Sequence, residues 1–328
     1  MSGYMYDLGY RNMSEATIVG ASKGLCGKAI ALFGTLDQQR KWLPLLAFGH
    51  TTGAFALTEA NAGSDIRNIS ATALLHPGKT HYILNGTKKF ITNGPTADVF
   101  VIFVKTDIDE YSAFLVERGI GLTSGKDIEK MGLHGSPTSE LQLNQCYVAA
   151  ENILGKKGDG LKIAMEVLSY GRFNLAASCM GSTLRIIHDI EEYAEKRVQF
   201  GKPIIEYKPI KRYIEDSRKR LMRLGKFFDH VASYKGRAFG TASAIVKIVA
   251  SELLWETADR AVQIAGGNGY VCGYPFEMFL RDARITRIFE GSNEVLHLLI
   301  KHNLLKLFKK NLFSKDFWKL FSYYILKM

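Results

Sequence analysis

The chain lacks the short motifs that mark the commonest nucleotide-dependent and zinc-dependent enzymes. It contains no G-x-x-x-x-G-K-[ST], no H-E-x-x-H and no strand followed by G-x-G-x-x-G. The sequence therefore offers no support for a P-loop, zincin or Rossmann site, and a dinucleotide, if bound, must be held in another way. We expect no metal site either, because the four cysteines are scattered and no C-x-x-C pair occurs.

Other absences concern the compartment. The cysteines, Cys26, Cys146, Cys179 and Cys272, do not form a disulfide framework, so we expect reduced thiols in a non-secretory compartment. No apolar run is expected to reach the length of a membrane span. Residues 1–20 show neither a secretory apolar core nor an Arg-rich transit character, so this chain carries no visible import signal.

Charge is unevenly distributed along the 328 residues. The net charge is +11, but seven lysines and one aspartate after residue 300 supply +6 of it. The rest of the chain is only mildly basic, so we expect no nucleic-acid partner. The composition, 47% hydrophobic and 23% charged, is that of an ordinary globular protein long enough for two or three domains.

Periodicity predicts a partial helical domain over residues 1–54. One buried helical face is expected from Leu25, Ala29, Ile30, Leu32 and Phe33. Gly34-Thr35 is expected to end that helix, and Asp37 to be the N-cap of a helix over 38–46.

Residues 55–155 have a different pattern, with short apolar and β-branched runs separated by Gly, Asn and Pro. This spacing predicts an antiparallel sandwich or barrel. The expected strands are 71–75, 82–84, 89–92, 99–105, 112–117 and 140–148.

Residues 156–303 return to helical periodicity, which makes the predicted fold α+β and multidomain. Four long helices and a continuation predict a four-helix bundle. The expected helices are 161–197, 210–234, 242–264, 276–288 and 293–308. Residues 304–328 form a basic, aromatic-rich amphipathic tail, which either lies on an anionic membrane surface or packs against its own domain or a partner subunit.

A glutamate lies at the break between the last two predicted helices. Glu290 stands between Phe289 and Gly291, where it is either a solvated helix cap or a base. The segment Ser292, Asn293 and Glu294 then offers the N-terminal amides of the next helix.

Four other polar motifs interrupt the predicted elements. Thr58 and Ser64 flank a Gly-containing turn that is either a connecting turn or a ligand loop. Arg172 lies within an apolar helix, so we expect a carboxylate or phosphate partner for it. Arg197-Val198-Gln199-Phe200-Gly201 follows a helix end, and Gly266-Gly267 is a helix stop.

Taken together and in this order, these motifs resemble the acyl-CoA dehydrogenase family. The segments Phe114–Gly119, Lys130–Gly132 and Ile288–Glu294 look most like its very-long-chain branch. The resemblance extends from about Leu25 to Ile300, and the chain is short at its N-terminus compared with the family. It implies the family fold: partial N-terminal helices, a middle β domain and a C-terminal four-helix bundle.

The resemblance implies FAD as the cofactor and assigns roles residue by residue. Glu290 would be the catalytic base, and Ser64, Arg172 and Gly291 would contact the substrate. The implied FAD contacts are Leu57, Thr58, Ser64, Phe90, Ile91, Thr92, Arg197, Gln199, Phe200, Gln263, Gly266, Gly267, Ser292, Asn293 and Glu294. Phe90 stands where the family usually has tryptophan, and Lys208 and Lys211 stand where it tends to have glutamines.

By the same resemblance, the reaction would be α,β-dehydrogenation of fatty acyl-CoA, the first step of β-oxidation, with electrons passing to an electron-transferring flavoprotein. A flavin site shared between subunits implies a homodimer or tetramer. The location would be mitochondrial, in the matrix or at the inner membrane, or cytoplasmic if the source is bacterial. Two alternatives stay open: a catalytically weak assembly or scaffold protein, and an acyl-CoA oxidase.

Overall fold

The computed structural model describes residues 1–309, which belong to two compact units. Unit 1 comprises Met1–Ala16, Met131–Leu133 and Arg172–Met328, and unit 2 comprises Thr17–Lys130 and His134–Gly171. Of the predicted tail, residues 310–328 lie outside the described residues. Each unit is described by itself below.

Unit 2 begins with short helices. Helix α2 (Met13–Val19) enters it and continues as the π-helical segment η1 (Gly20–Gly27), α3 (Lys28–Phe33) and α4 (Leu36–Phe48). The N-cap of α4 is Thr35 and not Asp37, so that prediction was wrong. Thr35 Oγ1 accepts from the Gln38 N–H at 3.2 Å, and the Gln38 side chain accepts from the Thr35 N–H at 2.9 Å, a reciprocal capping box.

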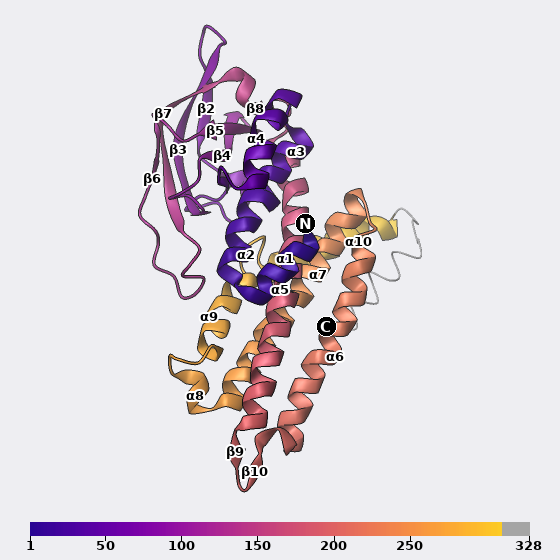
Figure 1. The fold of residues 1–328 in the computed structure, drawn as a ribbon. Coiled ribbons are helices and arrows are strands. Elements are labelled where there is room, and N and C mark those ends of the chain that lie inside the picture. The colour runs from indigo at the N-terminus through magenta and orange to yellow at the C-terminus, as the bar shows by residue number, and fades with distance from the viewer. Residues whose placement is uncertain (310–328) are drawn as a thin grey trace. The chain divides into compact units, whose positions relative to one another are not determined.

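An eight-stranded sheet follows in unit 2 (Figure 1). Its strands are β1 (Gly53–Ala56), β2 (Thr72–Leu75), β3 (His81–Thr92), β4 (Val99–Asp107), β5 (Glu110–Glu117), β6 (Leu122–Ser124), β7 (Thr138–Ala149) and β8 (Ile153–Leu154). The order is β6-β7-β3-β2-β4-β5-β8, with β1 beside β4. Most pairs are antiparallel, as predicted, but β1 and β2 each pair with β4 in parallel.

Strand β3 corrects the prediction of two separate strands at 82–84 and 89–92. It is continuous from His81 to Thr92, with shifts in its pairing to β7 between Leu84 and Gly86 and between Lys88 and Ile91. Positive φ angles of 138° at Gly86 and 58° at Phe90 mark these irregularities. Bulges disrupt a strict alternation while leaving the strand paired, which explains why the pattern suggested a break.

Alternate side chains of β4 and β5 enter two different cores. Val101 and Phe103 pack with α3, α4 and the start of α5, whereas Phe100 and Ile102 pack with residues of β3 and β7. Strand β4 is therefore buried on both faces, which accounts for its uninterrupted apolar sequence.

Unit 1 is helical. It contains α1 (Ser2–Arg11), the larger part of α5 (Gly160–Lys196), α6 (Lys208–Val231), α7 (Gly236–Ala265), α8 (Gly267–Tyr270), α9 (Phe276–Thr286) and α10 (Asn293–Lys309). The long helices agree with the predicted bundle, although α7 begins six residues earlier than expected. Helix α1 lies directly against α5, because a Cβ at Gly9 would overlap Ser178 O and one at Gly181 would overlap Tyr6 O.

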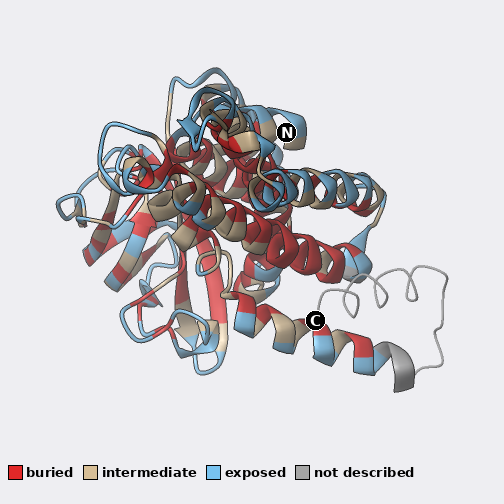
Figure 2. Cartoon of the chain, turned by 90° about the horizontal axis from the view of Figure 1, so that it is seen from below, coloured by how far each residue is buried: buried red, intermediate tan, exposed pale blue. Residues whose placement is uncertain are grey.

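The last described helix, α10, has one face toward its unit. Figure 2 shows buried and exposed residues alternating around it. Leu296, Ile300 and Leu304 are buried, while Leu298 and Leu305 are exposed. This is the pattern of a helix packed along one side.

Two helical stretches correct the expectation about apolar runs. Met13–Phe33 and Ala238–Ala265 are long and apolar enough to cross a membrane on length and composition alone. Within the most apolar window of Ala238–Ala265, however, 78% of residues are buried, which is typical of a core helix in a folded domain. The corresponding share for Met13–Phe33 is 44%.

Candidate active site

The predicted base lies in a turn with unusual backbone geometry in unit 1. Helix α9 ends at Thr286 and α10 begins at Asn293, and between them Glu290 has a φ of 58° and Gly291 a φ of 91°. A glutamate in the left-handed region is disfavoured by roughly 1 kcal/mol or more, so the surrounding structure must hold it there. Gly291 has both a positive φ and little room, because a Cβ would lie 3.2 Å from Leu296 Cδ2.

The Glu290 carboxyl group is removed from water. Although the residue as a whole is partly exposed, its Oε2 is buried and has no hydrogen-bond partner among the described residues. Burial raises the pKa of Glu290 to about 7, although the positive charges of Arg172 and Lys247 lower it. A carboxyl group that titrates near neutrality can accept a proton and release it again, as a general base must.

Arg172 holds the backbone of this turn. It is buried in the middle of α5, and its Nε donates to Glu290 O at 2.9 Å. Burial lowers the pKa of Arg172, and the Glu290 carboxylate raises it. We predicted a carboxylate or phosphate partner, but among the described residues Arg172 has no salt bridge, and its hydrogen bond goes to a carbonyl instead.

The Glu290 amide points to a second function of the turn. The neighbouring Phe289 N–H donates to Ile285 O at 3.1 Å, and the Asn293 N–H donates to Arg287 O at 3.0 Å. Within residues 1–309 no acceptor of the Glu290 N–H is found. A donor left free beside a titratable carboxyl group can hydrogen-bond a carbonyl oxygen of a ligand.

The three residues after Gly291 differ in their surroundings. Ser292 Oγ accepts from the Val295 N–H at 3.4 Å, and Glu294 is exposed. Asn293 is buried, and its amide is engaged inside the unit by Lys247, Ser251 and Glu252.

In unit 2 the structure joins two of the predicted flavin segments. The Lys89 N–H donates to Thr58 O at 2.8 Å, so the loop after β1 runs beside the end of β3. This loop carries Leu57, Thr58 and Ser64, and the end of β3 carries Phe90, Ile91 and Thr92. Phe90 is 58% exposed, while Leu57 and Ile91 are buried.

These unit 2 residues present a surface suited to a flat, polar ring. Thr58 and Thr92 are partly exposed, and their hydroxyls make no hydrogen bond with other described residues. Asn93 holds the strand end, because its Nδ2 donates to Ile18 O and to Gly53 O, each at 3.0 Å. An exposed aromatic ring beside free hydroxyls fits an isoalloxazine, which stacks and accepts hydrogen bonds.

A buried ion pair fixes the same loop, and the sequence reading missed it. Lys88 Nζ lies 2.7 Å from Glu59 Oε1 and also donates to Leu57 O at 3.3 Å. Glu59 Oε2 accepts from the Ser70 N–H and the Ser70 hydroxyl, each at 2.6 Å. No clear signal in the sequence pointed to it, because Lys88 lies in a polar stretch between the predicted strands 82–84 and 89–92.

The remaining predicted FAD contacts lie on loops of unit 1. The segment Arg197–Phe200, expected as a loop, forms a hairpin of β9 (Val198–Gln199) and β10 (Lys202–Pro203). Positive φ angles of 51° at Phe200 and 83° at Gly201 suit a two-residue hairpin turn. Arg197 and Gln199 are exposed, and Phe200 is 95% exposed.

The helix stop after α7 is as open as the hairpin. Gly266 ends α7 with a φ of 60°, and a Cβ at Gly266 or Gly267 would meet nothing within 4 Å. Gln263 is exposed, and Figure 1 places α8 and the β9–β10 hairpin at the same end of unit 1. Space at both glycines leaves their backbone accessible to a ligand.

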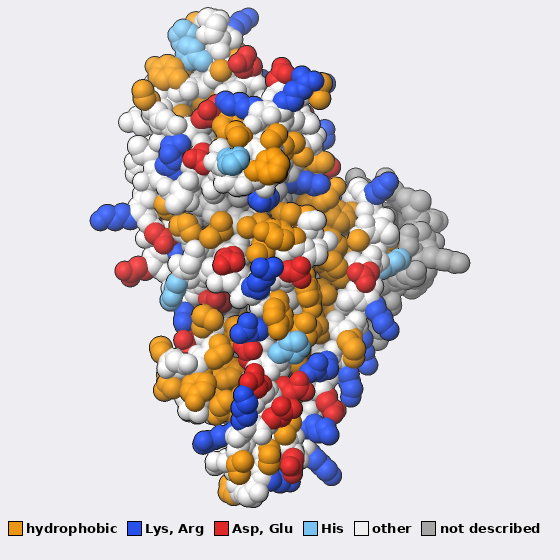
Figure 3. Space-filling view, in the orientation of Figure 1, with side chains coloured by type: hydrophobic (Ala, Val, Ile, Leu, Met, Phe, Trp, Pro, Cys, Tyr) orange, Lys and Arg blue, Asp and Glu red, His pale blue; other side chains and the backbone are white. Residues whose placement is uncertain are grey.

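Exposed apolar side chains gather in this part of unit 1. Figure 3 shows them over α8 and the start of α9. They include Tyr270, Val271, Tyr274 and Met278, which are between 42% and 83% exposed. Contiguous apolar surface of this kind marks an interaction site.

No group of three or more His, Cys, Asp or Glu side chains in the described part of the chain could hold a metal ion.

Comparison with known proteins agrees with these observations. Residues 54–146 match the family model "Acyl-CoA dehydrogenase, middle domain", and residues 158–305 match "Acyl-CoA dehydrogenase, C-terminal domain". An acyl-CoA dehydrogenase of Bacillus subtilis is 41% identical over 283 residues, which cover 84% of this chain and 74% of that protein.

A mitochondrial very long-chain specific acyl-CoA dehydrogenase of Macaca fascicularis is 37% identical over 311 residues. That match covers 89% of this chain but only 47% of the relative, so the chain spans about half its length. The bacterial relative is thus at least as similar as the very-long-chain one. A solved acyl-CoA dehydrogenase of Bacillus anthracis, complexed with FAD, superposes with a TM-score of 0.88 at 33% identity, over 95% of this chain and 57% of that one.

The predicted fold class is confirmed, with N-terminal helices, a β-sheet domain and a C-terminal helical domain. By sequence and by structure, the chain belongs to the acyl-CoA dehydrogenase family.

Proposed function

We propose that this protein is an FAD-dependent acyl-CoA dehydrogenase that introduces an α,β double bond into fatty acyl-CoA thioesters, with Glu290 as the base. The observation that carries the proposal is the Glu290 turn. It combines a buried carboxyl group, whose pKa burial raises to about 7, with a free backbone N–H on the same residue.

The chemical difficulty is the weak acidity of the α C–H bond. Glu290 Oε2 removes the α-proton, and the Glu290 N–H donates to the carbonyl oxygen, where negative charge develops. Burial of the carboxyl group strengthens both interactions, because water does not compete for them. Arg172 keeps the turn in place through Glu290 O. Bound FAD would supply the acceptor for the β-hydride, so that one proton and one hydride would leave the substrate.

We propose two groups of residues as FAD contacts. Thr58, Ser64 and Phe90–Thr92 would contact the flavin ring and its chain, a proposal supported by the exposed Phe90 ring and the free Thr58 and Thr92 hydroxyls. The FAD of a second subunit would be contacted by Arg197, Gln199, Phe200, Gln263, Gly266 and Gly267. Further FAD contacts are proposed for Leu57 and Ser292–Glu294. The exposed apolar surface over α8 supports a homodimer or tetramer.

Electrons are proposed to pass to an electron-transferring flavoprotein. The location follows the source of the chain: the Macaca relative is mitochondrial, and the comparably similar Bacillus protein is bacterial. We propose that the protein is a mitochondrial protein of β-oxidation if its source is eukaryotic, and a cytoplasmic protein if its source is bacterial.

The test is the visible absorbance of the purified protein before and after anaerobic addition of acyl-CoA. We expect flavin absorbance that is bleached by octanoyl-CoA or palmitoyl-CoA. A protein that stays colourless after incubation with FAD would contradict the proposal and favour an assembly role. Reoxidation by oxygen, and not by electron-transferring flavoprotein, would identify an acyl-CoA oxidase.

A further inference from the structure

A lone lysine lies deep inside helix α7. Lys247 is fully buried, and its neighbours Ile245, Val246 and Ile248 are buried as well. Burying an ammonium group costs several kcal/mol unless opposite charge and hydrogen bonds compensate. We therefore expect hydrogen bonds and a negative charge that stabilise this buried ammonium group.

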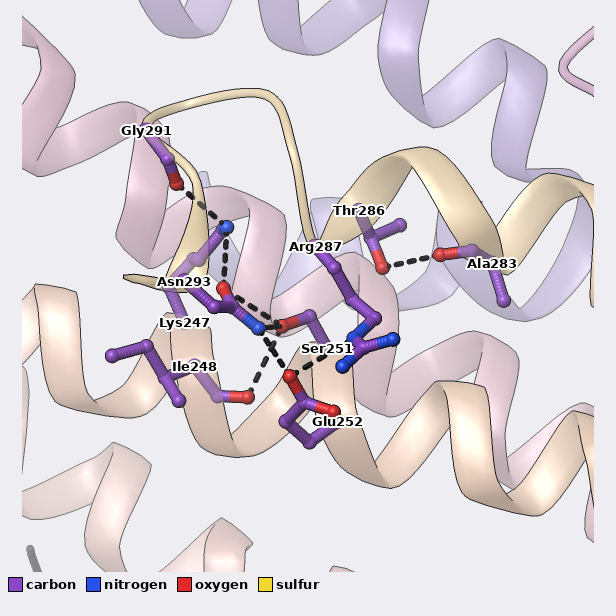
Figure 4. Close-up of polar contacts among 9 residues, drawn as sticks. All are labelled: Lys247, Ile248, Ser251, Glu252, Ala283, Thr286, Arg287, Gly291 and Asn293. Atoms are coloured by element: carbon purple, nitrogen blue, oxygen red, sulfur yellow. Dashed lines mark hydrogen bonds and ion pairs between the residues drawn. The ribbon is translucent and has the colours of Figure 1, made fainter. Parts of the chain in front are cut away.

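Lys247 reaches the turn that carries the proposed base. Its Nζ donates to Gly291 O at 2.9 Å and to Asn293 Oδ1 at 2.8 Å (Figure 4). Gly291 directly follows Glu290, so the ammonium group is hydrogen-bonded to the backbone of the residue next to the proposed base. Among the described residues, Lys247 has no salt bridge.

Asn293 makes two further hydrogen bonds to residues of α7. Its Nδ2 donates to Ser251 Oγ at 3.0 Å and to Glu252 Oε1 at 2.6 Å. Arg287 Nε donates to the same Glu252 oxygen at 2.9 Å (Figure 4). Both ends of the turn, Arg287 and Asn293, are thereby tied to the same helix.

The charges around Lys247 identify the anion that it balances. Among the described residues, the ionisable groups with the largest effects on it are Cys179, Glu290, Arg172 and Glu252. Burial raises the pKa of the Cys179 thiol to about 12, so this group is neutral, and Arg172 carries the same sign as Lys247. Glu252 is already paired with Arg287. Among these groups of the described residues, Glu290 is the carboxylate that remains.

We propose that Lys247 is a positioning residue for Glu290, holding the Gly291–Asn293 turn by two hydrogen bonds and favouring the ionised carboxylate by its charge. The base role of Glu290 comes from the proposed function above. The supporting electrostatics agree in direction: burial lowers the pKa of Lys247 to about 8, and the Glu290 carboxylate raises it. At neutral pH the lysine is therefore mostly protonated.

The test is a pH titration of the Glu290 carboxyl band by infrared difference spectroscopy, with Glu290→Gln identifying the band. Lys247→Gln removes the charge and keeps a donor. We expect it to raise the midpoint of the Glu290 titration by about one pH unit or more. The acidic limb of the pH profile of kcat/KM should move with it.

Two controls separate charge from packing. Lys247→Arg keeps the charge and should leave the midpoint near that of the wild type, and Lys226→Gln, at an exposed position of α6, should not move it. If Lys247→Gln does not fold, Lys247→Met replaces it, because an apolar chain of similar length fills the same volume.

An unchanged midpoint in the folded neutral variant would overturn the proposal, and so would an equal rise in Lys247→Arg. If both neutral variants unfold while Lys247→Arg folds, the cation serves the fold and the proposal is also overturned. Retained dehydrogenation in Glu290→Gln would instead refute the base assignment, whatever the Lys247 variants show.

Discussion

Arg172 and Lys247 donate hydrogen bonds to consecutive backbone carbonyls, Arg172 to Glu290 O and Lys247 to Gly291 O, each at 2.9 Å. Two buried cations from different helices, α5 and α7, therefore hold one turn with two successive positive φ angles. Their charges also lower the pKa of Glu290, against the larger effect of burial. The same two groups thus hold the turn of the proposed base and partly offset the effect of burial on its ionisation.

Replacement of the proposed base should abolish the reaction without removing the cofactor. In Glu290→Gln the amide cannot take the α-proton, so acyl-CoA-dependent flavin reduction is expected to fall by about 10²–10⁴-fold or more. Stopped-flow absorbance measures the rate, and the flavin-to-protein absorbance ratio measures cofactor retention. The control is Glu195→Gln, at an exposed position of α5. Wild-type rates in Glu290→Gln would show that another group is the base.

The same variant should change how stability depends on pH. Burial raises the pKa of Glu290 from an ordinary 4.5 to about 7, so between these values the unfolded state releases its proton while the folded state keeps it. The stability contribution of this group is therefore complete below about pH 4.5 and is lost as the pH rises through 7.

Glu290→Gln does not titrate and escapes this loss. We expect its free energy of unfolding to exceed that of the wild type by about 1–3 kcal/mol at pH 8, and by much less near pH 5. Urea titrations across this range measure the difference. A difference that does not vary with pH would mean that the carboxyl group is solvated.

The buried pair of unit 2 should be costly to break from one side. Lys88→Met leaves the Glu59 carboxylate without its cation, and we expect a loss of about 3–5 kcal/mol in unfolding free energy. Burial alone would raise the pKa of Glu59, but Lys88 and Ser70 outweigh it and lower that pKa. The losses of unfolding free energy in Glu59→Gln and in Lys88→Met should therefore add up to more than the loss in the double variant Glu59→Gln/Lys88→Met.

A matched control is the surface pair of Lys41 and Glu117, whose side chains are each 53% exposed. Lys41→Met should cost less than about 1 kcal/mol. Similar losses in Lys41→Met and Lys88→Met would mean that the Glu59–Lys88 pair is not buried in solution.

The cap of α4 gives a direct comparison of two neighbouring residues. Thr35→Ala removes the acceptor of the Gln38 N–H, so we expect a loss of about 0.5–2 kcal/mol. Asp37 is 95% exposed and 3.7 Å from an exposed Arg40, so Asp37→Ala should cost only a few tenths of a kcal/mol. Thermal or urea unfolding of the two variants measures both losses of stability. A larger loss of stability in Asp37→Ala than in Thr35→Ala would show that Asp37 is the N-cap.

The sequence by itself determined the fold class and the order of elements. Helical and strand periods depend on local spacing, so α5, α6, α9 and the strands β2, β4, β5 and β7 could be predicted within a few residues. The short strands β1, β6 and β8 were not predicted. The Glu290-Gly291 pair was also visible, because a carboxylate beside glycine at a helix break is a local feature. Predictions failed where neighbouring signals compete, as between Thr35 and Asp37, or where bulges interrupt a pattern, as in β3.

Only the tertiary structure decided what surrounds these residues. The partners of Lys247 are 44 and 46 residues away in sequence, and the Glu59–Lys88 pair spans 29. In the sequence Lys247 looks like an ordinary interruption of an apolar run, and Lys88 lies in a polar stretch between two predicted strands. Burial and long-range contacts set the charge balance around Glu290, because desolvation depends on every element packed against a group and not on its neighbours in the chain.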